Sequence, residues 1–217
     1  MASIPFICVL DFEANTEKAR DSDLDIIEFP SILLKFNYTT LNYDEIGTFS
    51  SFVRPKINHI LTTFCKDLTA ITQLQINSAD DFPTVMNRHY EWLRSIIIGQ
   101  GFVLTDVVIL TCGEWDLKTA LVNECTKYGI LPKRVYTSYL NVKDLFMHIM
   151  KTTKNLGMPR MLAKLKLQLV GHHHSGFDDS KNIARIVQAL CRKGLVIDKR
   201  FIKRVDPSSY NLLHLIQ

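Results

Sequence analysis

A run of apolar residues from Ile4 to Leu10 comes directly before Asp11 and Glu13. A short, continuous apolar run of this kind is typical of a β-strand that is covered on both faces. The run lacks the basic flank and small-residue cleavage site of a signal peptide, and it is too short to span a membrane. The chain is therefore predicted to fold around a buried strand whose sheet is covered by helices.

The remaining elements are predicted in a mixed order. Segments 26–36 and 47–53 are rich in Ile, Phe, Leu and Val, and with the first strand they predict an antiparallel meander. Residues 42–45 form a polar approach to the third strand, and Pro30 is expected to make the second strand edge-like or bulged. Further strands are predicted over 107–112 and 135–139.

Helices are expected between and after these strands, with a capping-box spacing at Ser78–Asp81 before one of them. Their predicted ranges are 60–67, 69–74, 82–97, 117–128, 142–151, 158–169 and 177–193. The fold class is therefore α/β, with a mixed β-sheet (an antiparallel meander plus parallel strands) covered by helices.

The 217 residues contain no internal repeat, low-complexity tract or Pro/Gly/Ser linker, so one domain is expected, with residues 1–205 as its body and 206–217 as a C-terminal tail. The apolar segment 211–216 is expected to pack back on the core, and a partner-binding strip is the alternative. Five cysteines are scattered singly, which favours buried thiols in a reducing compartment over a disulfide framework.

Charge is distributed unevenly along the chain. Residues 1–132 carry 10 Lys/Arg against 17 Asp/Glu, whereas residues 133–217 carry 16 against 5. An acidic part that can hold divalent cations and a basic part that can hold phosphates are what an enzyme acting on a polyanion requires. A basic surface that merely keeps the protein in solution remains the alternative.

Carboxylates follow both of the strands that are predicted to be most buried. Asp11 and Glu13 stand two residues apart and would point to the same side of the first strand, where they repel each other unless cations share them. Asp116 follows the strand at 107–112 and opens the next helix, where capping is the commoner role of an acidic residue. Because neighbouring strands of a sheet lie ~5 Å apart, Asp116 can face Asp11 and Glu13 across one site.

A glycine-flanked segment, 171–176, precedes the last predicted helix and contains three adjacent histidines. Asp179 shares the buried face of that helix with Ile183, whereas Asp178 is the better candidate for its N-cap. His174 can lie over the metal-binding side of Asp179. No Cys or Glu stands at zinc-site spacing from the histidines, so four hard carboxylates favour Mg²⁺ or Mn²⁺ over zinc.

Taken in order, these residues resemble the DEDDh class of 3′→5′ exonucleases, which have an RNase H-like fold. Within that class the sequence is similar to the enhanced-RNAi/three-prime histone-mRNA exonuclease family over roughly residues 5–197. The shared motifs are Leu10-Asp11-Phe12-Glu13-Ala14, Ile26-Ile27-Glu28-Phe29-Pro30, Phe52-Val53-Arg54-Pro55, Phe64-Cys65, Leu68-Thr69-Ala70-Ile71-Thr72-Gln73, Phe82-Pro83, Trp115-Asp116 and His174-Ser175-Gly176-Phe177-Asp178-Asp179-Ser180-Lys181-Asn182-Ile183-Ala184. Asn15 and Ala70 depart from the family, which usually has Thr and Gly at these positions.

The resemblance implies a 3′→5′ exoribonuclease that uses two Mg²⁺ (or Mn²⁺) ions and releases nucleoside 5′-monophosphates from RNA 3′ ends. Asp11 would bridge the ions, Glu13 and Asp179 would complete the first ion's shell, and Asp116 would act through water or the second ion. His174 would be the general base, which suits a group that titrates near neutrality. The same resemblance places the substrate's terminal base between Phe64 and Trp115, and its 3′-hydroxyl at the backbone of Ala14.

Two other functions remain open. A deoxyribonuclease of the same class, acting on single-stranded DNA, would have identical site chemistry, since only contacts to the 2′-hydroxyl distinguish the sugars. An inactive nucleic-acid-binding module would be expected to lack at least one acidic ligand, and all four are present. The expected partner is the RNA 3′ end, with no membrane partner, and the expected location is cytoplasmic and/or nuclear.

Overall fold

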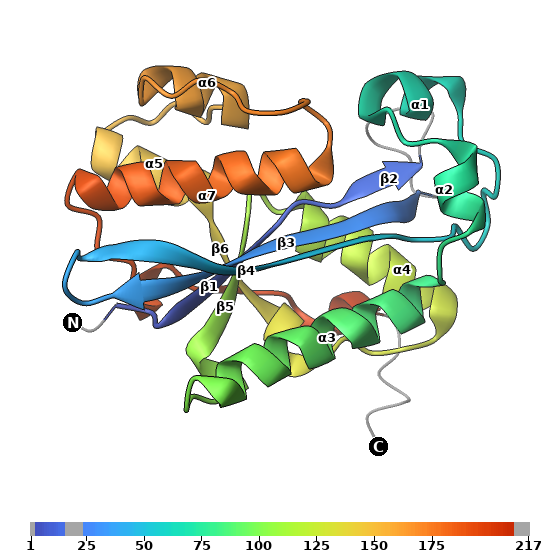
Figure 1. Cartoon of the computed structure of the whole chain (residues 1–217), viewed down its shortest axis with the longest axis horizontal. Coiled ribbons are helices and arrows are strands. Elements are labelled where there is room, and N and C mark those ends of the chain that lie inside the picture. The colour runs from blue at the N-terminus through green and yellow to red at the C-terminus, as the bar shows by residue number, and fades with distance from the viewer. Residues whose placement is uncertain (1–2, 16–23, 211–217) are drawn as a thin grey trace.

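A computed structural model of the chain describes residues 3–15 and 24–210. Within them a seven-stranded mixed sheet is hydrogen-bonded along the path β2-β3-β1-β5-β6-β7. β2 and β1 pair with successive stretches of one side of β3, and β4 pairs with its other side. Helices cover both faces of this sheet (Figure 1). The predicted fold class is therefore confirmed.

The antiparallel half of the sheet consists of β1 (Phe6–Leu10), β2 (Glu13–Asn15), β3 (Asp25–Asn37) and β4 (Asn42–Phe52). β1 and β2 pair with the same side of β3, and the chain between them is interrupted at Asp11 and Phe12. Pro30 lies opposite this interruption, where the ladder is already broken. The expectation of an edge strand is wrong, because β3 is paired on both sides. The alternative of a bulged strand agrees with the structure, since β3 has register shifts against β4 at Leu33/Leu34 and against β2 at Glu13/Ala14, although neither lies at Pro30.

The parallel half consists of β5 (Val107–Thr111) beside β1 and β6 (Ser138–Asn141) beside β5, with β7 (Lys203–Arg204) antiparallel at the edge. Phe6 pairs with Val107 and Val9 with Leu110. Since the two strands run in the same direction, their carboxyl ends lie at one end of the sheet. This topology brings the segments after Leu10 and after Thr111 together.

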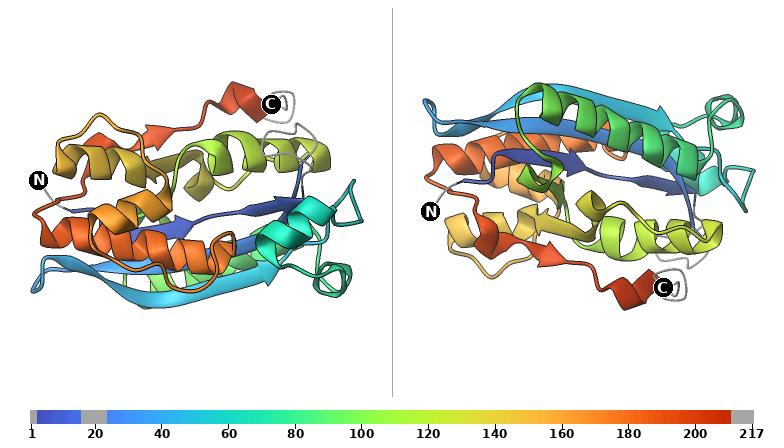
Figure 2. Two further views of the ribbon diagram at one scale, coloured as in Figure 1. Left: turned by 90° about the horizontal axis from the view of Figure 1, so that it is seen from above. Right: turned by 90° about the horizontal axis from the view of Figure 1, so that it is seen from below.

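The helices form two layers (Figure 2). Their bounds are α1 (Thr63–Thr69), α2 (Gln73–Asn77), α3 (Phe82–Gly99), α4 (Leu121–Tyr128), α5 (Val142–Met150), α6 (Met158–Lys164) and α7 (Gly176–Arg192). One apolar core lies between the sheet and α3 and α4, and a second lies between the sheet and α5, α6 and α7. β1 contributes alternate residues to both cores, as a strand covered on both faces must.

Several predicted boundaries are corrected by the structure. The polar residues 42–45 belong to β4, and the helices predicted over 60–74 lie two to four residues later, as α1 and α2. Asp81 rather than Ser78 caps α3, and Ser78 instead ends α2. Residues 134–137 form a 3₁₀ turn before β6, and α6 ends at Lys164, well before 169. β2 and β7 were missed because each is only two or three residues long.

The described C-terminal residues stay close to the body of the molecule. Val205 is buried and donates its N–H to the carbonyl of Thr137, and a 3₁₀ turn at Pro207–Tyr210 lies against α4. The apolar segment 211–216 lies outside the described residues. No disulfide joins the five cysteines, and no helix in ranges 3–15 and 24–210 has the length and apolarity to cross a membrane.

Candidate active site

Three carboxylates gather where β1 and β5 end. Asp11 lies in the interruption between β1 and β2, Glu13 begins β2, and Asp116 opens a π-helical turn (Asp116–Ala120) that continues into α4. The interruption frees the N–H of Phe12 from the ladder, and it donates to Oδ1 of Asp116 at 2.9 Å. The sequence prediction that Asp116 faces Asp11 and Glu13 therefore agrees with the structure.

Asp179 comes to the same place from the first turn of α7. It is buried together with Ile183, as the helical spacing predicted, and ligand oxygens of Asp11, Glu13 and Asp179 lie within 4.8 Å of one another. The prediction that Asp178 caps the helix is wrong. α7 begins at Gly176, and Ser175 is the N-cap, with its hydroxyl accepting from the N–H of Asp178.

The three histidines take different positions around Asp179. His173 Nδ1 lies 2.9 Å from Asp179 Oδ2, and the backbone N–H of His174 donates to the same oxygen at 3.0 Å. The His173 and His174 rings stack at 3.9 Å between centroids, while His172 is exposed. His174 adopts φ 71°, a left-handed conformation that a non-glycine residue takes at some cost. This turn places both rings beside the carboxylates.

The buried carboxyl groups share one environment that disfavours their charges. Burial raises the pKa of Asp11 well above its usual range, with Asp116, Glu13, Asp179 and Glu28 adding to the effect. Burial and then Glu28 raise the pKa of Glu13 to about 9. Burial also raises the pKa of Asp116 to about 6, against the lowering effect of the Phe12 N–H. A cluster of this kind is stabilised by bound cations.

Glu28 is a fifth carboxylate of the cluster, itself buried, that sequence reasoning did not assign to the site. It lies opposite Glu13 in the β2–β3 register, and it accepts from the N–H of Gly176 at 3.0 Å and of Phe177 at 3.3 Å. It thus ties β3 to the start of α7, which carries Asp179. The start of α7 lies so close to Asp11 that a Cβ on Gly176 would be 2.5 Å from the Asp11 carbonyl oxygen. The Glu28-Phe29-Pro30 motif was the only signal of this role.

Lys143 is a second functional candidate that the sequence did not single out. It lies in the first turn of α5, directly after β6, and its charge lowers the pKa of Asp116. Its ammonium group would lie 3.6 Å from a Cβ placed on Gly113, in the loop between β5 and Asp116. Lys143 therefore places a cation beside the acidic cluster, where a phosphate could be bound.

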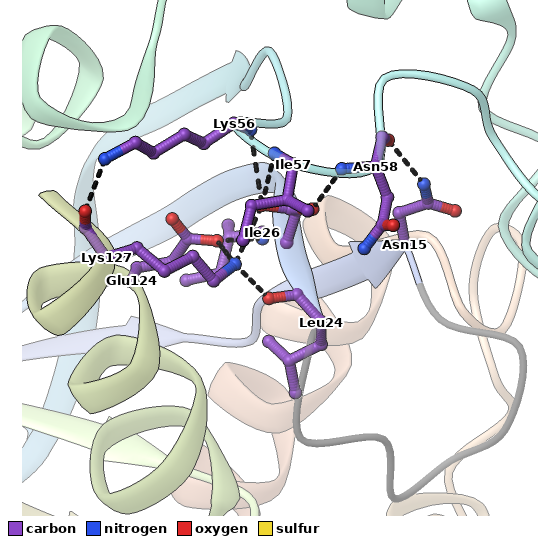
Figure 3. A network of polar contacts seen from close by, with 9 residues as sticks. Asn15, Leu24, Ile26, Lys56, Ile57, Asn58, Glu124 and Lys127 are labelled. Carbon is purple, nitrogen blue, oxygen red and sulfur yellow. Dashed lines mark hydrogen bonds and ion pairs between the residues drawn. The ribbon is translucent and has the colours of Figure 1, made fainter.

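The segment that leads into α1 is held by a polar network around the end of β2 (Figure 3). Asn15 donates to the carbonyls of Asn58 and Ile60 and accepts from the N–H of Thr62. Asp25 accepts from the backbone N–H groups of residues 56, 57 and 58. Asn15, where the resemblance leads one to expect Thr, thus has a structural role. Its amide group donates two hydrogen bonds and accepts one, whereas the hydroxyl of Thr has only one hydrogen to donate.

Lys127 completes this network from α4. Its ammonium group lies 2.7 Å from Asp25 and 3.1 Å from Glu124, and it donates to the carbonyl of Leu24. Glu124 in turn accepts from the N–H of Ile26 at 2.7 Å. Both carboxylates are almost fully buried, so the pairing is what makes their charges tolerable there. The network fixes β2 and the 56–62 segment relative to α4.

The predicted base-binding residues come from different elements of the fold. Cys65 of α1 contacts the Ala14 carbonyl at 3.6 Å, which places α1 against β2 and leaves the neighbouring Phe64 44% exposed. Trp115 directly precedes Asp116 and is partly buried against the α3/α4 core. The Ala14 backbone is in β2. The Phe64 ring is therefore accessible from solvent, while part of Trp115 is engaged in packing.

Replacing Phe64 by Ala should raise the KM for a nucleic-acid substrate with little change in kcat. Stacking of a base on an aromatic side chain contributes ~1–3 kcal/mol, a ~5- to 150-fold change in affinity. Steady-state kinetics on an end-labelled oligonucleotide would measure this, with Ile98→Ala (54% exposed, on α3) as the matched control. An unchanged KM for Phe64→Ala would remove Phe64 from the substrate site.

Comparisons with known proteins agree with this geometry. The exonuclease family model RNase_T matches residues 8–187. The chain is 36% identical over 192 residues to the mouse (Mus musculus) protein 3'-5' exoribonuclease 1. The aligned region covers 87% of this chain and 54% of that protein. The chain thus spans about half the length of the curated relatives it matches.

Solved structures are similar over nearly the whole chain. The nuclease domain of 3'hExo, a DEDDh family member bound to rAMP, superposes with a TM-score of 0.82 at 32% identity, covering 93% of this chain and 98% of that one. A 3'-exonuclease that recognises the 3' end of the histone mRNA stem-loop superposes with a TM-score of 0.79 at 30% identity, covering 96% and 93%.

Proposed function

The chain belongs to the RNase_T exonuclease family and, within it, to the DEDDh class, and on that premise we propose that it is a 3′→5′ exoribonuclease. Its products would be nucleoside 5′-monophosphates released one at a time from RNA 3′ ends. The observation that carries this proposal is the convergence of Asp11, Glu13 and Asp179, whose ligand oxygens lie within 4.8 Å, beside His174 and Asp116. The relatives named as exoribonucleases support RNA over DNA as the substrate.

Divalent cations fit the residues that are present. Oδ1 of Asp179 is buried and has no hydrogen-bond partner among the described residues, although its neighbour Oδ2 has two. An unpartnered buried carboxylate oxygen aimed into a cluster of acids is the expected state of a metal ligand without its ion. The donors are hard oxygens, which suit Mg²⁺ or Mn²⁺.

In this proposal Asp11, Glu13 and Asp179 would hold one ion, and Asp11 with Asp116 would hold a second. Two such ions, when bound, stabilise the charge on the attacking and leaving oxygens of an in-line phosphoryl displacement. The hydrogen bond from the Phe12 N–H to Asp116 holds Asp116 beside Asp11 and Glu13. The hydrogen bond from the Gly176 N–H to Glu28 holds the start of α7 against them.

The protein's own chemical contribution would come from His174. Burial, followed by the charge of His173, lowers the pKa of His174 below its usual value of 6.5. The ring is therefore neutral at pH 7, and one of its nitrogens can accept a proton from the attacking water. The water oxygen would then bond to phosphorus, and the bond from phosphorus to the upstream 3′-oxygen would break. The leaving oxygen would take a proton from solvent to become the new 3′-hydroxyl, and His174 would return its proton to solvent.

Substrate position would be set by Phe64, Trp115 and the backbone of Ala14. Phe64 and Trp115 offer apolar faces to the terminal base without sequence preference. The backbone of Ala14 would bind the terminal 3′-hydroxyl. Because β2 is pinned through Asn15 and Asp25, this contact would be held rigidly beside Glu13.

End-labelled substrates provide the test. We expect stepwise shortening of linear RNA from its 3′ end in Mg²⁺ or Mn²⁺, no activity in EDTA, and strong inhibition by a 3′-phosphate, which would clash with the hydroxyl-binding backbone. Products resolved by length on linear RNA, single-stranded DNA, duplex and circular RNA would measure this. Cleavage of circular RNA, or full activity in EDTA, would contradict the assignment, and a preference for DNA would make the chain a deoxyribonuclease.

A further inference from the structure

A basic pocket lies at the end of the sheet opposite the carboxylates. It has a volume of about 580 Å³ and is lined by the first residues of β5, by the 133–138 segment before β6, and by the 199–204 segment that ends in β7. Because β5 is five residues long, the pocket and the carboxylate cluster are separated by roughly 15 Å at ~3.3 Å per residue. This pocket is separate from the site described above.

Four cationic side chains line the pocket: Lys133, Arg134, Lys199 and Arg204. No acidic residue is among its lining residues, and in the described part of the chain none of the four forms an ion pair. Their immediate neighbours are different. Arg200 pairs with Asp198, and Lys203 pairs with Glu114 and Asp144. In the 199–204 segment, Arg200 and Lys203 do not line the pocket and are paired with carboxylates. Lys199 and Arg204 line the pocket and have no ion pair among the described residues.

The rest of the pocket wall suits a phosphate-bearing strand. Thr105, Thr137, Ser138 and Tyr90 line it beside the cations, and the apolar remainder of the wall consists of Leu104, Val107, Val108, Val135 and Ile202. The wall is rigid, since Ser138 pairs with Arg204 in the β6–β7 ladder and the Val205 N–H donates to Thr137. Like charges gathered on a fixed wall repel each other unless an anion binds between them. The volume is also within the range of ligand-binding clefts.

We propose that this pocket binds backbone phosphates of the RNA substrate upstream of the 3′ end that occupies the catalytic site. The inference rests on the proposed exoribonuclease function. At a rise of ~3.4 Å per nucleotide in a stacked strand, at least about five nucleotides separate the pocket from the carboxylates. Long substrates reach the pocket and short ones do not, so the pocket increases the affinity for long RNA.

The test compares two variants with the same change in charge. In the pocket variant Lys133, Arg134, Lys199 and Arg204 are all replaced by Gln. In the control variant the replaced residues are Lys151, Lys154, Arg192 and Lys193, which are exposed and lie outside the pocket. Binding of a labelled RNA of about 20 nucleotides and of a trinucleotide is measured in EDTA over a range of salt concentrations, since each lost phosphate contact lowers the salt slope by ~0.7 on single strands.

We expect the pocket variant to lose at least about tenfold in affinity for the long RNA relative to the trinucleotide, with a smaller salt slope, and the control variant to keep the wild-type ratio. Equal losses in the two variants would mean general attraction to a basic surface and would overturn the proposal. A loss of binding to 5′-AMP or pyrophosphate alone, with long RNA unaffected, would make the occupant a free nucleotide. Because no hydrolysis is needed, a chain that binds RNA here without shortening it would contradict only the proposed function.

Discussion

Replacing Asp11 by Asn should reduce exonuclease turnover by about a thousandfold or more while raising the melting temperature of the metal-free protein. The loss of turnover follows because Asp11 is the carboxylate that would be shared between two ions, and metal ions contribute several kcal/mol to the stabilisation of the transition state, at 1.36 kcal/mol for each tenfold in rate. The gain in stability follows from the crowding of Asp11 with Asp116, Glu13, Asp179 and Glu28.

The sign of the pH effect can be derived from these shifts. A carboxyl group whose pKa is higher in the folded than in the unfolded protein binds its proton more tightly when folded. Its contribution to stability is fully present below the unfolded pKa and is lost as the pH rises through the folded pKa. With Asp116 near 6 and Glu13 near 9, the metal-free protein should lose stability steadily between about pH 4 and about pH 9. Asp11→Asn should make this loss smaller.

Thermal melting with and without Mg²⁺ would measure both effects in one experiment. Mg²⁺ should raise the melting temperature of the wild type more than that of Asp11→Asn, because the variant has fewer charged ligands. Asp81→Asn is the matched control, since Asp81 caps α3 far from the carboxylates and Asn is also a good N-cap. A large drop in the melting temperature of metal-free Asp11→Asn would show that Asp11 is needed for folding and would contradict its assignment as a ligand.

The sequence predicted the parts of the fold that depend on local pattern and strand direction. The buried strands at β1 and β5 follow from continuous apolar runs, and their parallel pairing explains why Asp11, Glu13 and Asp116 converge. The resemblance to the DEDDh exonucleases is confirmed by the family model and by the solved structures, which share the RNase H-like fold. The roles of the individual site residues stay predictions.

Features that depend on contacts between distant segments were not predicted. Glu28 reaches the start of α7, 148 residues away, only because β3 pairs with β2 in one particular register. Helix α1 begins later than expected because Asn15 and Asp25 hold residues 56–62 in a non-helical segment, and α2 begins later because Ala70 ends α1 in a left-handed conformation. The cap of α7 was assigned to Asp178, which instead accepts from the N–H of His172 inside the loop. Apart from the late start of α2, each of these errors arises from a side-chain-to-backbone hydrogen bond that the periodicity and capping patterns of the sequence do not show.

His174→Ala should lower kcat by ~10²–10⁴-fold, the range expected for the loss of a general base, while binding of Mg²⁺ persists. The five-residue spacing that pairs His174 with Asp179 also pairs His173 with Asp178, and the contacts of Asp178 and Asp179 support the first pair. Asp178 is bonded to the His172 N–H, whereas His173 contacts Asp179 through Nδ1. On this assignment His173 would hold the ligand Asp179 in place, and the ring of His174 would be available to accept a proton.

The pH–rate profile distinguishes a base from a residue that only positions Asp179. Because burial lowers the pKa of His174, its neutral form predominates above the usual value of 6.5 and is lost only as the pH falls below it. The acid limb of kcat/KM should therefore lie below pH 6.5 in the wild type and disappear in His174→Ala. His173→Ala should keep the limb, with a smaller loss of rate and weaker Mg²⁺ binding, and the exposed His172→Ala is the control. If His173→Ala is inactive and His174→Ala retains both rate and limb, the base is His173.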